Sequence, residues 1–268
     1  RLEVKTVVVH NLKKKRSVDL TGINLTDNAD DVLCDDEIQM VVEVMGTVNI
    51  AKEYIERALK AGKHVITANK DLIATHGPEL ISLAKEHGCD LCYEASVAGG
   101  IPILRTIVNS FAADRIIEVR GIVNGTTNYI MTQMNKNGAS YEDALESAQE
   151  LGFAEADPTN DVDGIDAAYK MIILTQFAFG KDVTMDQVKV KGIRGIQKAD
   201  IAEAKRLGYV IKLLGIAKLV NGHIDVSVLT GVILTLFIML LLCTIFTNQD
   251  AASVSKLKAR QPDKIQYL

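Results

Sequence analysis

The sequence predicts an α/β protein that has a parallel sheet in its first half and a mixed α/β region after it. Short apolar runs alternate with helical patterns of about ten to fifteen residues over the first half, which is the order that a parallel sheet with helical crossovers requires. Helices and a hairpin pattern follow. A length of 268 residues with 48% hydrophobic content suffices for one large domain or two modest ones.

The first half predicts four strands separated by helices. Val7, Val8 and Val9 are consecutive, which indicates a buried first strand, and Gly62 marks the end of an amphipathic helix. Pro102 stands where a first helical turn tolerates proline. The expected strands are residues 3–12, 38–46, 64–69 and 90–100, and the expected helices are residues 48–63, 70–88 and 103–113.

The second half predicts one strand, several helices and a hairpin. Ser140 is an expected helix N-cap, and Asn221-Gly222 is a typical two-residue hairpin turn. The expected strand is residues 115–123, the expected helices are residues 124–134, 141–152, 164–179 and 196–208, and the expected hairpin is residues 209–228.

Ligands of parallel α/β sheets gather beyond the carboxyl ends of the strands. Three segments are expected at such ends, namely residues 45–47, 67–70 and 94–100. The sequence therefore directs the search for a cofactor site to these segments.

Charge and cysteine content exclude some classes of protein. A net charge of −4, the absence of Trp and 5% aromatic residues argue against a nucleic-acid surface. The basic cluster Lys13–Arg16 is either a solvated turn or a phosphate contact.

Cys89 and Cys92 form a C-x-x-C pair, but zinc needs two more ligands, and Cys92 is expected in a buried strand. Sparse cysteine suits the reducing cytoplasm.

An uncharged run extends from Val226 to Thr247. It is long enough to cross a bilayer, which takes about 20 residues. Lys256, Lys258, Arg260 and Lys264 follow and would place the C-terminus in the cytoplasm. We therefore expect a transmembrane helix or membrane anchor over residues 226–247, and a buried strand pair is the alternative.

Residues 155–170, EADPTNDVDGIDAAYK, combine many carboxylates with one terminal lysine. Three interpretations are open. Asp166 and Lys170 are four residues apart, so on a helix they form a surface ion pair. A calcium loop with Gly164 at its sixth position would place Lys170 where a bidentate Glu belongs. A buried polar site is the third interpretation, in which the lysine and carboxylates bind an amino-acid ammonium group and move a proton.

Five motifs together resemble homoserine dehydrogenase, over residues 2–227. They are VVEVMG, AGKHVITANKDLIATHG, YEASVAGGIPILRTI, GIVNGTTNYIM and GFAEADPTNDVDGIDAAYK. The resemblance implies reduction of aspartate 4-semialdehyde to L-homoserine with NADPH or NADH, on the route to threonine and methionine. It also implies a Rossmann-type nucleotide domain followed by an α/β catalytic and dimerisation domain, and hence a homodimer.

The resemblance assigns roles to the acidic run. Lys170 matches the general acid/base at the substrate, and Lys70 matches a second lysine beside nicotinamide and substrate. Glu155 and Asp166 match the carboxylates that hold the substrate, and Asp161 matches a supporting acid. The residue types suit the chemistry, because hydride addition to a carbonyl leaves an alkoxide that a positioned cation and proton donor stabilise.

The resemblance also implies binding sites for cofactor and metal. Gly46 and Thr47 match the cofactor-contacting loop, although many relatives have Gly where Thr47 stands. No acid occurs at His10 to bind the ribose hydroxyls, and basic residues follow, which favours NADP over NAD. A sodium site is implied for Glu94, Val97, Gly99 and Ile101, with a glycine turn as the alternative. Residues 124–127 match a segment near the site and equally suit a helix cap.

The sequence departs from the family at both ends. The family's first strand and Gly-rich loop should precede Arg1, and no G-x-G-x-x-G occurs in the chain. The expected domains are a partial dinucleotide-binding domain at 1–105, a catalytic domain at 106–228 and an atypical apolar segment with a basic tail at 229–268. A fragment, a decayed gene and a membrane-tethered variant are three explanations. A non-catalytic remnant that binds substrate or a partner subunit is the alternative to an enzyme.

Overall fold

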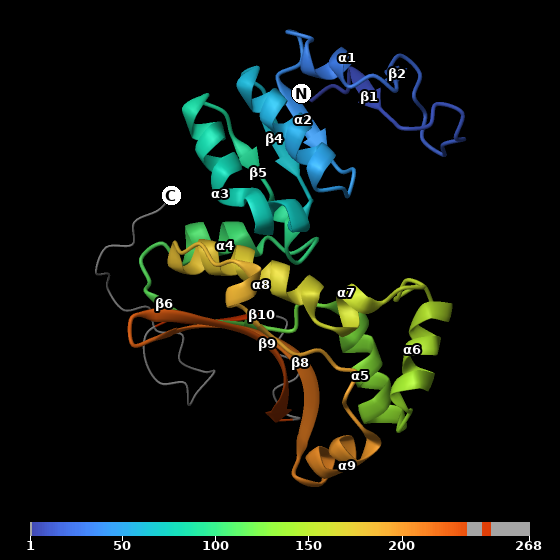
Figure 1. Cartoon of the computed structure of the whole chain (residues 1–268), viewed down its shortest axis with the longest axis vertical. Helices are drawn as coiled ribbons and strands as arrows, with labels where there is room; N and C mark the ends of the chain where they lie inside the picture. Colours follow the sequence, from blue (N-terminus) through green and yellow to red (C-terminus); the bar gives the residue numbers. More distant parts are fainter. Residues whose placement is uncertain (1, 235–242, 248–268) are drawn as a thin grey trace. The chain divides into compact units, whose positions relative to one another are not determined.

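The computed structural model describes residues 2–234 and 243–247. The chain divides into two compact units, Arg1–Ser96 and Val97–Leu268 (Figure 1). The predicted fold class is confirmed, with parallel strands and helices in the first unit and a mixed arrangement in the second. The structure adds short elements at residues 24–26, 30–33, 159–162, 189–190 and 243–247 that the sequence pattern does not predict.

The first unit contains two small parallel sheets. Strands β1 and β2 pair with each other, and β3, β4 and β5 form a separate sheet in that order. The elements are β1 (Thr6–Val8), β2 (Asn24–Thr26), α1 (Asp30–Leu33), β3 (Met40–Glu43), α2 (Asn49–Lys60), β4 (His64–Thr67), α3 (Lys70–Glu86), β5 (Leu91–Cys92) and η1 (Glu94–Ser96).

Helix α2 supplies much of the core of this unit. Its buried residues Ala51, Ile55, Ala58 and Leu59 follow the i, i+4, i+7 and i+8 spacing of one helix face. They join a cluster with residues of α1, β4 and α3, among them Leu33, Val65, Leu72 and Leu80. The core therefore lies between the helices and the β3-β4-β5 sheet, and the strand ends are left to carry polar loops.

Two predictions of burial in this unit are wrong. Val8 in β1 is 37% exposed, because the only strand paired with β1 among the described residues is the short β2. Cys92 lies in β5 as expected, but it is exposed. Strand β5 is two residues long and lies at the edge of its sheet, so it is not covered on both sides.

The second unit is built on a mixed five-stranded sheet with the order β10-β6-β8-β9-β7. Its pairs are antiparallel except β7 with β9. The elements are α4 (Ile103–Ser110), β6 (Ile116–Gly121), α5 (Gly125–Asn137), α6 (Tyr141–Glu150), α7 (Thr159–Val162), α8 (Ile165–Phe179), η2 (Met185–Gln187), β7 (Lys189–Val190), α9 (Lys198–Arg206), β8 (Tyr209–Val220), β9 (His223–Leu234) and β10 (Cys243–Thr247).

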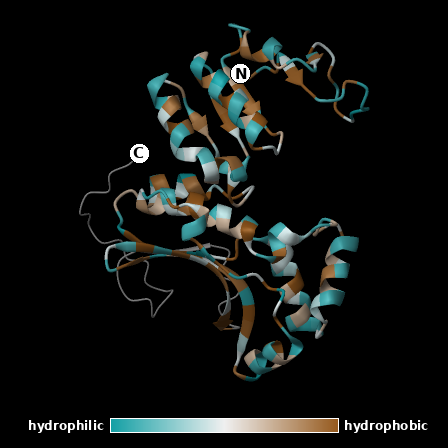
Figure 2. Ribbon diagram, viewed as in Figure 1, coloured by the Kyte–Doolittle hydropathy of each residue, from teal (hydrophilic) through white to brown (hydrophobic). Residues whose placement is uncertain are grey.

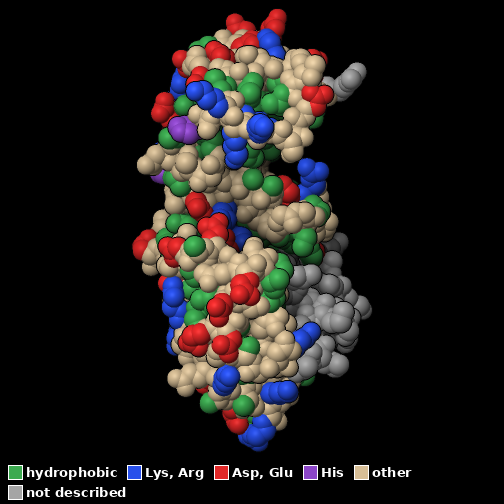
Figure 3. All heavy atoms as spheres, turned by 90° about the vertical axis from the view of Figure 1, so that its right-hand side faces the viewer, with side chains coloured by type: hydrophobic (Ala, Val, Ile, Leu, Met, Phe, Trp, Pro, Cys, Tyr) green, Lys and Arg blue, Asp and Glu red, His purple; other side chains and the backbone are tan. Residues whose placement is uncertain are grey.

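Helix α8 packs against β6, β8 and β9, and α4 packs against α8. Met171 is fully buried, and an ideal Cβ at Gly215 of β8 would lie 2.5 Å from its Sδ atom, so the helix lies very close to the sheet there. Helix α6 buries Ala144 and Ala148, and apart from Leu145 its other residues are hydrophilic (Figure 2). Exposed acidic residues of α6 and of the loop after it lie on the face of the second unit that Figure 3 shows.

The prediction of a membrane helix over residues 226–247 is wrong, because the first part of this run belongs to the β8–β9 hairpin. Val226–Leu234 belong to β9, which pairs with β8 along its whole length, and Cys243–Thr247 form β10. In the described part of the chain, no helix has both the length and the apolar character to cross a membrane. Residues 235–242 and the basic residues from Lys256 to Lys264 lie outside the described residues. Hydropathy misled here because a partly buried strand rich in β-branched residues is as uncharged as a membrane span.

Candidate active site

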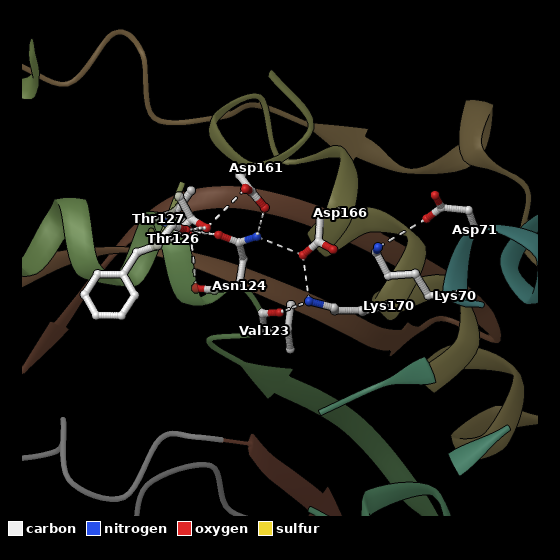
Figure 4. Close-up of polar contacts among 10 residues, drawn as sticks. Lys70, Asp71, Val123, Asn124, Thr126, Thr127, Asp161, Asp166 and Lys170 are labelled. Carbon is white, nitrogen blue, oxygen red and sulfur yellow. Dashed lines mark hydrogen bonds and ion pairs between the residues drawn. The ribbon is translucent and has the colours of Figure 1, made fainter. Parts of the chain in front are cut away.

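Helix α8 presents a lysine–aspartate pair. Asp166 lies in its first turn, and Lys170 lies one turn later on the same face. The Nζ atom of Lys170 donates to Oδ2 of Asp166 at 2.7 Å and to the carbonyl oxygen of Val123 at 2.9 Å (Figure 4). The two side chains are 19% and 11% exposed. The ion pair is therefore largely buried rather than a surface pair, and it is held by α8 together with the segment between β6 and α5.

Asn124 joins two carboxylates to this pair. Its Nδ2 atom donates to Oδ1 of Asp161 at 2.6 Å and to Oδ2 of Asp166 at 2.8 Å. The other oxygen of Asp161 accepts from Oγ1 of Thr126 at 3.1 Å. Asn124 is also the N-cap of α5, since its Oδ1 atom accepts from the backbone of Thr127 at 2.8 Å. Residues 124–127 thus form a helix cap and contact the acidic site at once.

The cluster can bind and move a proton. Two carboxylates and an ammonium group lie within one hydrogen-bonded network. Burying such charges is unfavourable unless they are paired and hydrogen-bonded, and this network meets that need. Its residues provide a cationic proton donor and anionic acceptors for a ligand's amino group.

The loop that follows β7 packs against the segment that carries Asp161 and Asp166. An ideal Cβ at Gly192 would lie 2.0 Å from the carbonyl oxygen of Val162 and 2.5 Å from Cα of Asp163. The Nε atom of Arg194 donates to Oδ1 of Asp163 at 2.5 Å, and Ile193 donates its backbone N–H to the oxygen of Val162 at 2.8 Å. The segment that carries Asp161 and Asp166 is therefore fixed by close backbone contact. It belongs to α7 (Thr159–Val162) and the start of α8 (Ile165–Phe179) rather than to a calcium loop.

The first unit has its own polar group at the ends of β3 and β4. Asn69 caps α3 through its Oδ1 atom and donates Nδ2–H to the carbonyl of Thr47 at 2.7 Å. Buried Glu43 accepts from Oγ1 of Thr67 at 2.7 Å and from the backbone of Met45 at 2.6 Å. Gly46 has a φ of +75°, which glycine adopts without strain. These bonds tie together two of the predicted strand-end segments, 45–47 and 67–70.

Lys70 is the first residue of α3, and its Nζ atom lies 3.5 Å from Oδ1 of Asp71. It thus stands directly after the Asn69 cap, at the carboxyl end of β4. The structure places Gly46, Thr47 and Lys70 within the same unit, and Asn69 joins the loop of Gly46 and Thr47 to the start of α3.

The remaining predicted site residues are Glu155 and the sodium segment. Glu155 is exposed on the loop between α6 and α7. Its backbone carbonyl oxygen, rather than its carboxylate, accepts a hydrogen bond from Nε2 of Gln149 at 3.0 Å. In the predicted sodium segment, Val97 is buried, whereas Ile101 is 47% exposed. Among the residues that the structure describes, no group of three or more His, Cys, Asp or Glu could hold a metal ion.

Sequence reasoning missed the carbonyl of Val123 and the Asn69 bridge. A backbone carbonyl has no signal in the sequence, because every residue carries one. Asn69 did carry a signal, since an Asn directly before a helix is a typical N-cap. Its second bond, to Thr47, depends on a contact between segments far apart in the chain.

The fold and these networks define a class of protein before any comparison. A parallel α/β unit with polar loops at its strand ends, followed by a mixed α/β unit with a buried lysine among carboxylates, is the arrangement of a two-part, nucleotide-binding α/β protein. Residues 1–94 match the family model described as homoserine dehydrogenase, NAD binding domain, and residues 102–237 match the model described as homoserine dehydrogenase. The chain belongs to the homoserine dehydrogenase family.

Individual relatives agree. A homoserine dehydrogenase of Bacillus subtilis is 53% identical over 225 residues, which are 84% of this chain and 52% of the relative. The crystal structure of a homoserine dehydrogenase from Thiobacillus denitrificans matches with a TM-score of 0.82 and 42% identity, covering 85% of this chain and 52% of that chain. A hyperthermophilic archaeal homoserine dehydrogenase in complex with NADPH matches with a TM-score of 0.71 and 28% identity, over 83% of this chain and 66% of that chain. The chain spans about half the length of the curated relatives it matches.

Proposed function

We propose that this chain acts in the reversible reduction of L-aspartate 4-semialdehyde to L-homoserine with a nicotinamide cofactor, in the synthesis of threonine and methionine. The observation that carries the proposal is Lys170, whose amine is held between Asp166 and the carbonyl of Val123 in a largely buried network. Family membership supports the same reaction. We assign nucleotide binding to residues 1–105 and catalysis to residues 106–228.

Lys170 is the proposed proton donor. Addition of hydride to the aldehyde carbon leaves an alkoxide, which takes a proton from the ammonium group of Lys170. In the reverse direction the neutral amine removes the hydroxyl proton. Asp166, Asp161 and Glu155 are the proposed carboxylates for the substrate's amino and hydroxyl groups. Exposed Glu155 has to turn toward the substrate to take this part.

NADP is the proposed cofactor, and it supplies the hydride when it is bound. The first unit fits part of such a group, because the Gly46–Thr47 loop and the start of α3 are fixed to each other by Asn69. Gly46, Thr47 and Lys70 would hold it. The loop after β1 carries exposed Lys13, Lys14 and Lys15, which suit the extra phosphate of NADP.

Three further assignments complete the proposal. Exposed apolar residues of the hairpin, with Val232 at 60% and Leu234 at 42%, support a homodimer. Free thiols at Cys34, Cys89 and Cys92 support a cytoplasmic location. Sodium binding by Glu94, Val97, Gly99 and Ile101 stays a prediction, to be tested by the dependence of turnover on Na⁺ at constant ionic strength.

The test is NADPH oxidation by the chain with aspartate semialdehyde. We expect Lys170→Ala to lower turnover by at least about 100-fold, the effect of losing a general acid, while NADPH binding measured by fluorescence stays unchanged. Exposed Lys181→Ala is the matched control. Near-normal turnover of Lys170→Ala would remove Lys170 from this role. A parent chain that binds NADPH and homoserine without turnover would instead support the non-catalytic alternative.

A further inference from the structure

The side-chain amide of Asn124 is fully hydrogen-bonded within the protein. Its Nδ2 atom donates to Asp161 at 2.6 Å and to Asp166 at 2.8 Å. Its Oδ1 atom accepts from the backbone N of Thr127 at 2.8 Å and from Oγ1 of Thr127 at 2.7 Å. An amide has two N–H donors and one oxygen with two lone pairs, and here all four positions are used. Asn124 is 5% exposed, so water does not compete for them.

These partners fix which way the amide points. Exchanging its oxygen and nitrogen would place the oxygen against two carboxylates and the NH₂ group against the N–H of Thr127. Each of these contacts would then be repulsive, because acceptor would face acceptor and donor would face donor. The helix cap therefore sets the direction in which the two N–H groups point.

The segment of Val123 and Asn124 also contacts the amine of Lys170. Val123, the residue before Asn124, accepts from Lys170 at 2.9 Å through its carbonyl oxygen. Oδ2 of Asp166 receives both the amide of Asn124 at 2.8 Å and the amine of Lys170 at 2.7 Å. The Val123–Asn124 segment thus holds the acceptor and the donor of the lysine–aspartate pair from one piece of backbone between β6 and α5.

We propose that Asn124 is a positioning residue for this site, an inference that rests on the proposed function. By donating one N–H hydrogen bond to each carboxylate, it keeps Asp161 and Asp166 side by side at a set separation despite their like charges. It thereby orients the carboxylates that bind the amino-acid end of the substrate. The helix cap is the device that holds Asn124 in place for this task.

Substitutions separate the cap from the positioning role. Asn124→Ser and Asn124→Asp both keep a good N-cap, but each loses the NH₂ group that bonds the carboxylates. The matched control is Ser140→Ala, which removes the N-cap of α6 without touching the site. We expect Asn124→Ser to lower kcat/KM by about tenfold or more, since the lost bonds are to charged groups, and to weaken homoserine binding in calorimetry. We expect Asn124→Asp to be worse, because it adds a third carboxylate. Ser140→Ala should lose stability alone.

NMR gives a readout that does not need activity. The Asn124 side-chain amide, assigned by its loss in Asn124→Ser, should exchange with solvent much more slowly than that of exposed Asn137. The carboxyl carbon shifts of Asp161 and Asp166 should move in Asn124→Ser and stay in place in Ser140→Ala. If the parent neither turns over nor binds homoserine, the proposed function fails, and these signals alone decide whether Asn124 holds the carboxylates.

Two results would overturn the proposal. One is fast amide exchange at Asn124 with unmoved carboxyl signals. The other is an active parent whose Asn124→Ser and Asn124→Asp variants keep kcat, KM and homoserine affinity within about twofold while losing stability as Ser140→Ala does. Either would leave Asn124 as a helix cap only.

Discussion

Lys212 is a buried lysine that lies outside the proposed site. It is 5% exposed on β8, and its Nζ atom donates to Oδ1 of Asn128 at 2.7 Å, to the carbonyl of Asn128 at 3.2 Å and to Oγ1 of Thr132 at 2.6 Å. All of these partners lie on α5 and are neutral. Burial therefore lowers the pKa of Lys212 to about 8, and the charge of Lys136 adds to this effect.

The lowered pKa of Lys212 predicts a pH-dependent stability. Between about pH 8 and 10.5, the unfolded chain holds more protons at this lysine than the folded chain does, so its contribution to the free energy of unfolding rises with pH. Below about pH 8 the unfavourable contribution of buried, charged Lys212 to the free energy of unfolding is constant. Urea unfolding of the parent and of Lys212→Met, at steps from about pH 7 to 10, should show the parent gaining stability relative to the variant.

Exposed Lys205→Met on α9 is the control for Lys212. Its difference from the parent should stay flat over the same range. A flat difference for Lys212→Met as well would show that this amine titrates alike in the folded and unfolded chains.

At the scale of elements, the contact between the β7–α9 loop and the α7–α8 junction is the tightest that a glycine makes in the described chain. Gly192→Ala would place a methyl group against the backbone of Val162 and Asp163, which cannot rotate away as a side chain can. We expect a loss of about 1–3 kcal/mol in the free energy of unfolding. We also expect lower turnover, because Asp161 and Asp166 flank the displaced segment.

The same loop offers a matched control. Gly195 has no atom within 4 Å of an ideal Cβ and needs no positive φ, so Gly195→Ala should change stability by no more than about 0.5 kcal/mol. Equal behaviour of the two variants in denaturant titrations would argue that the loop moves freely to admit a side chain.

Local signals predicted most elements well. Helix α6 begins after Ser140 and α5 after Asn124, because both caps act within one turn of chain. Burial of β1 and Cys92 was predicted wrongly, since burial depends on neighbouring strands that a local pattern does not contain. The site followed the same division. Lys170 and Asp166 share a helix face and could be paired from their spacing, whereas the bonds from Val123 and Asn124 cross from another element.

At the scale of the whole molecule, the sheet of the second unit depends on strands that are far apart in sequence. Glu118 of β6 lies opposite Lys218 of β8, and β8 is joined to β9 by the two-residue turn Asn221-Gly222. Both turn residues have positive φ, +49° and +83°, as a type I′ turn requires. This turn sets the register of the twelve-residue strands on both sides.

The turn gives a prediction for the folding of the second unit. Asn221→Val places a β-branched residue at positive φ and should cost about 1–2 kcal/mol in the free energy of unfolding. Asn221→Gly should be tolerated, because glycine adopts this conformation freely. Chemical denaturation followed by signals from β8 would measure both. Equal stability of the valine and glycine variants would contradict a type I′ turn in solution.

The run from Val226 to Thr247 shows where prediction at this scale failed. Hydropathy and length pointed to a membrane helix, but Val226–Leu234 pair with β8. The β-branched residues Thr230 and Val232 favour a strand over a helix, and Asn221-Gly222 just upstream predicts a hairpin turn. The two signals conflicted, and the partner strand decided between them.

The carbonyl of Val123 has a consequence for how this site can change over generations. One of the two acceptors for the Lys170 amine belongs to the main chain, and a codon change at position 123 alters only the side chain. Mutational scans will therefore score position 123 by how well a side chain packs, and they will not detect its role at the amine. Natural drift can replace Val123 by another residue while its carbonyl oxygen still accepts from Lys170. This hydrogen bond therefore depends on the fold of the backbone and not on the residue type at position 123.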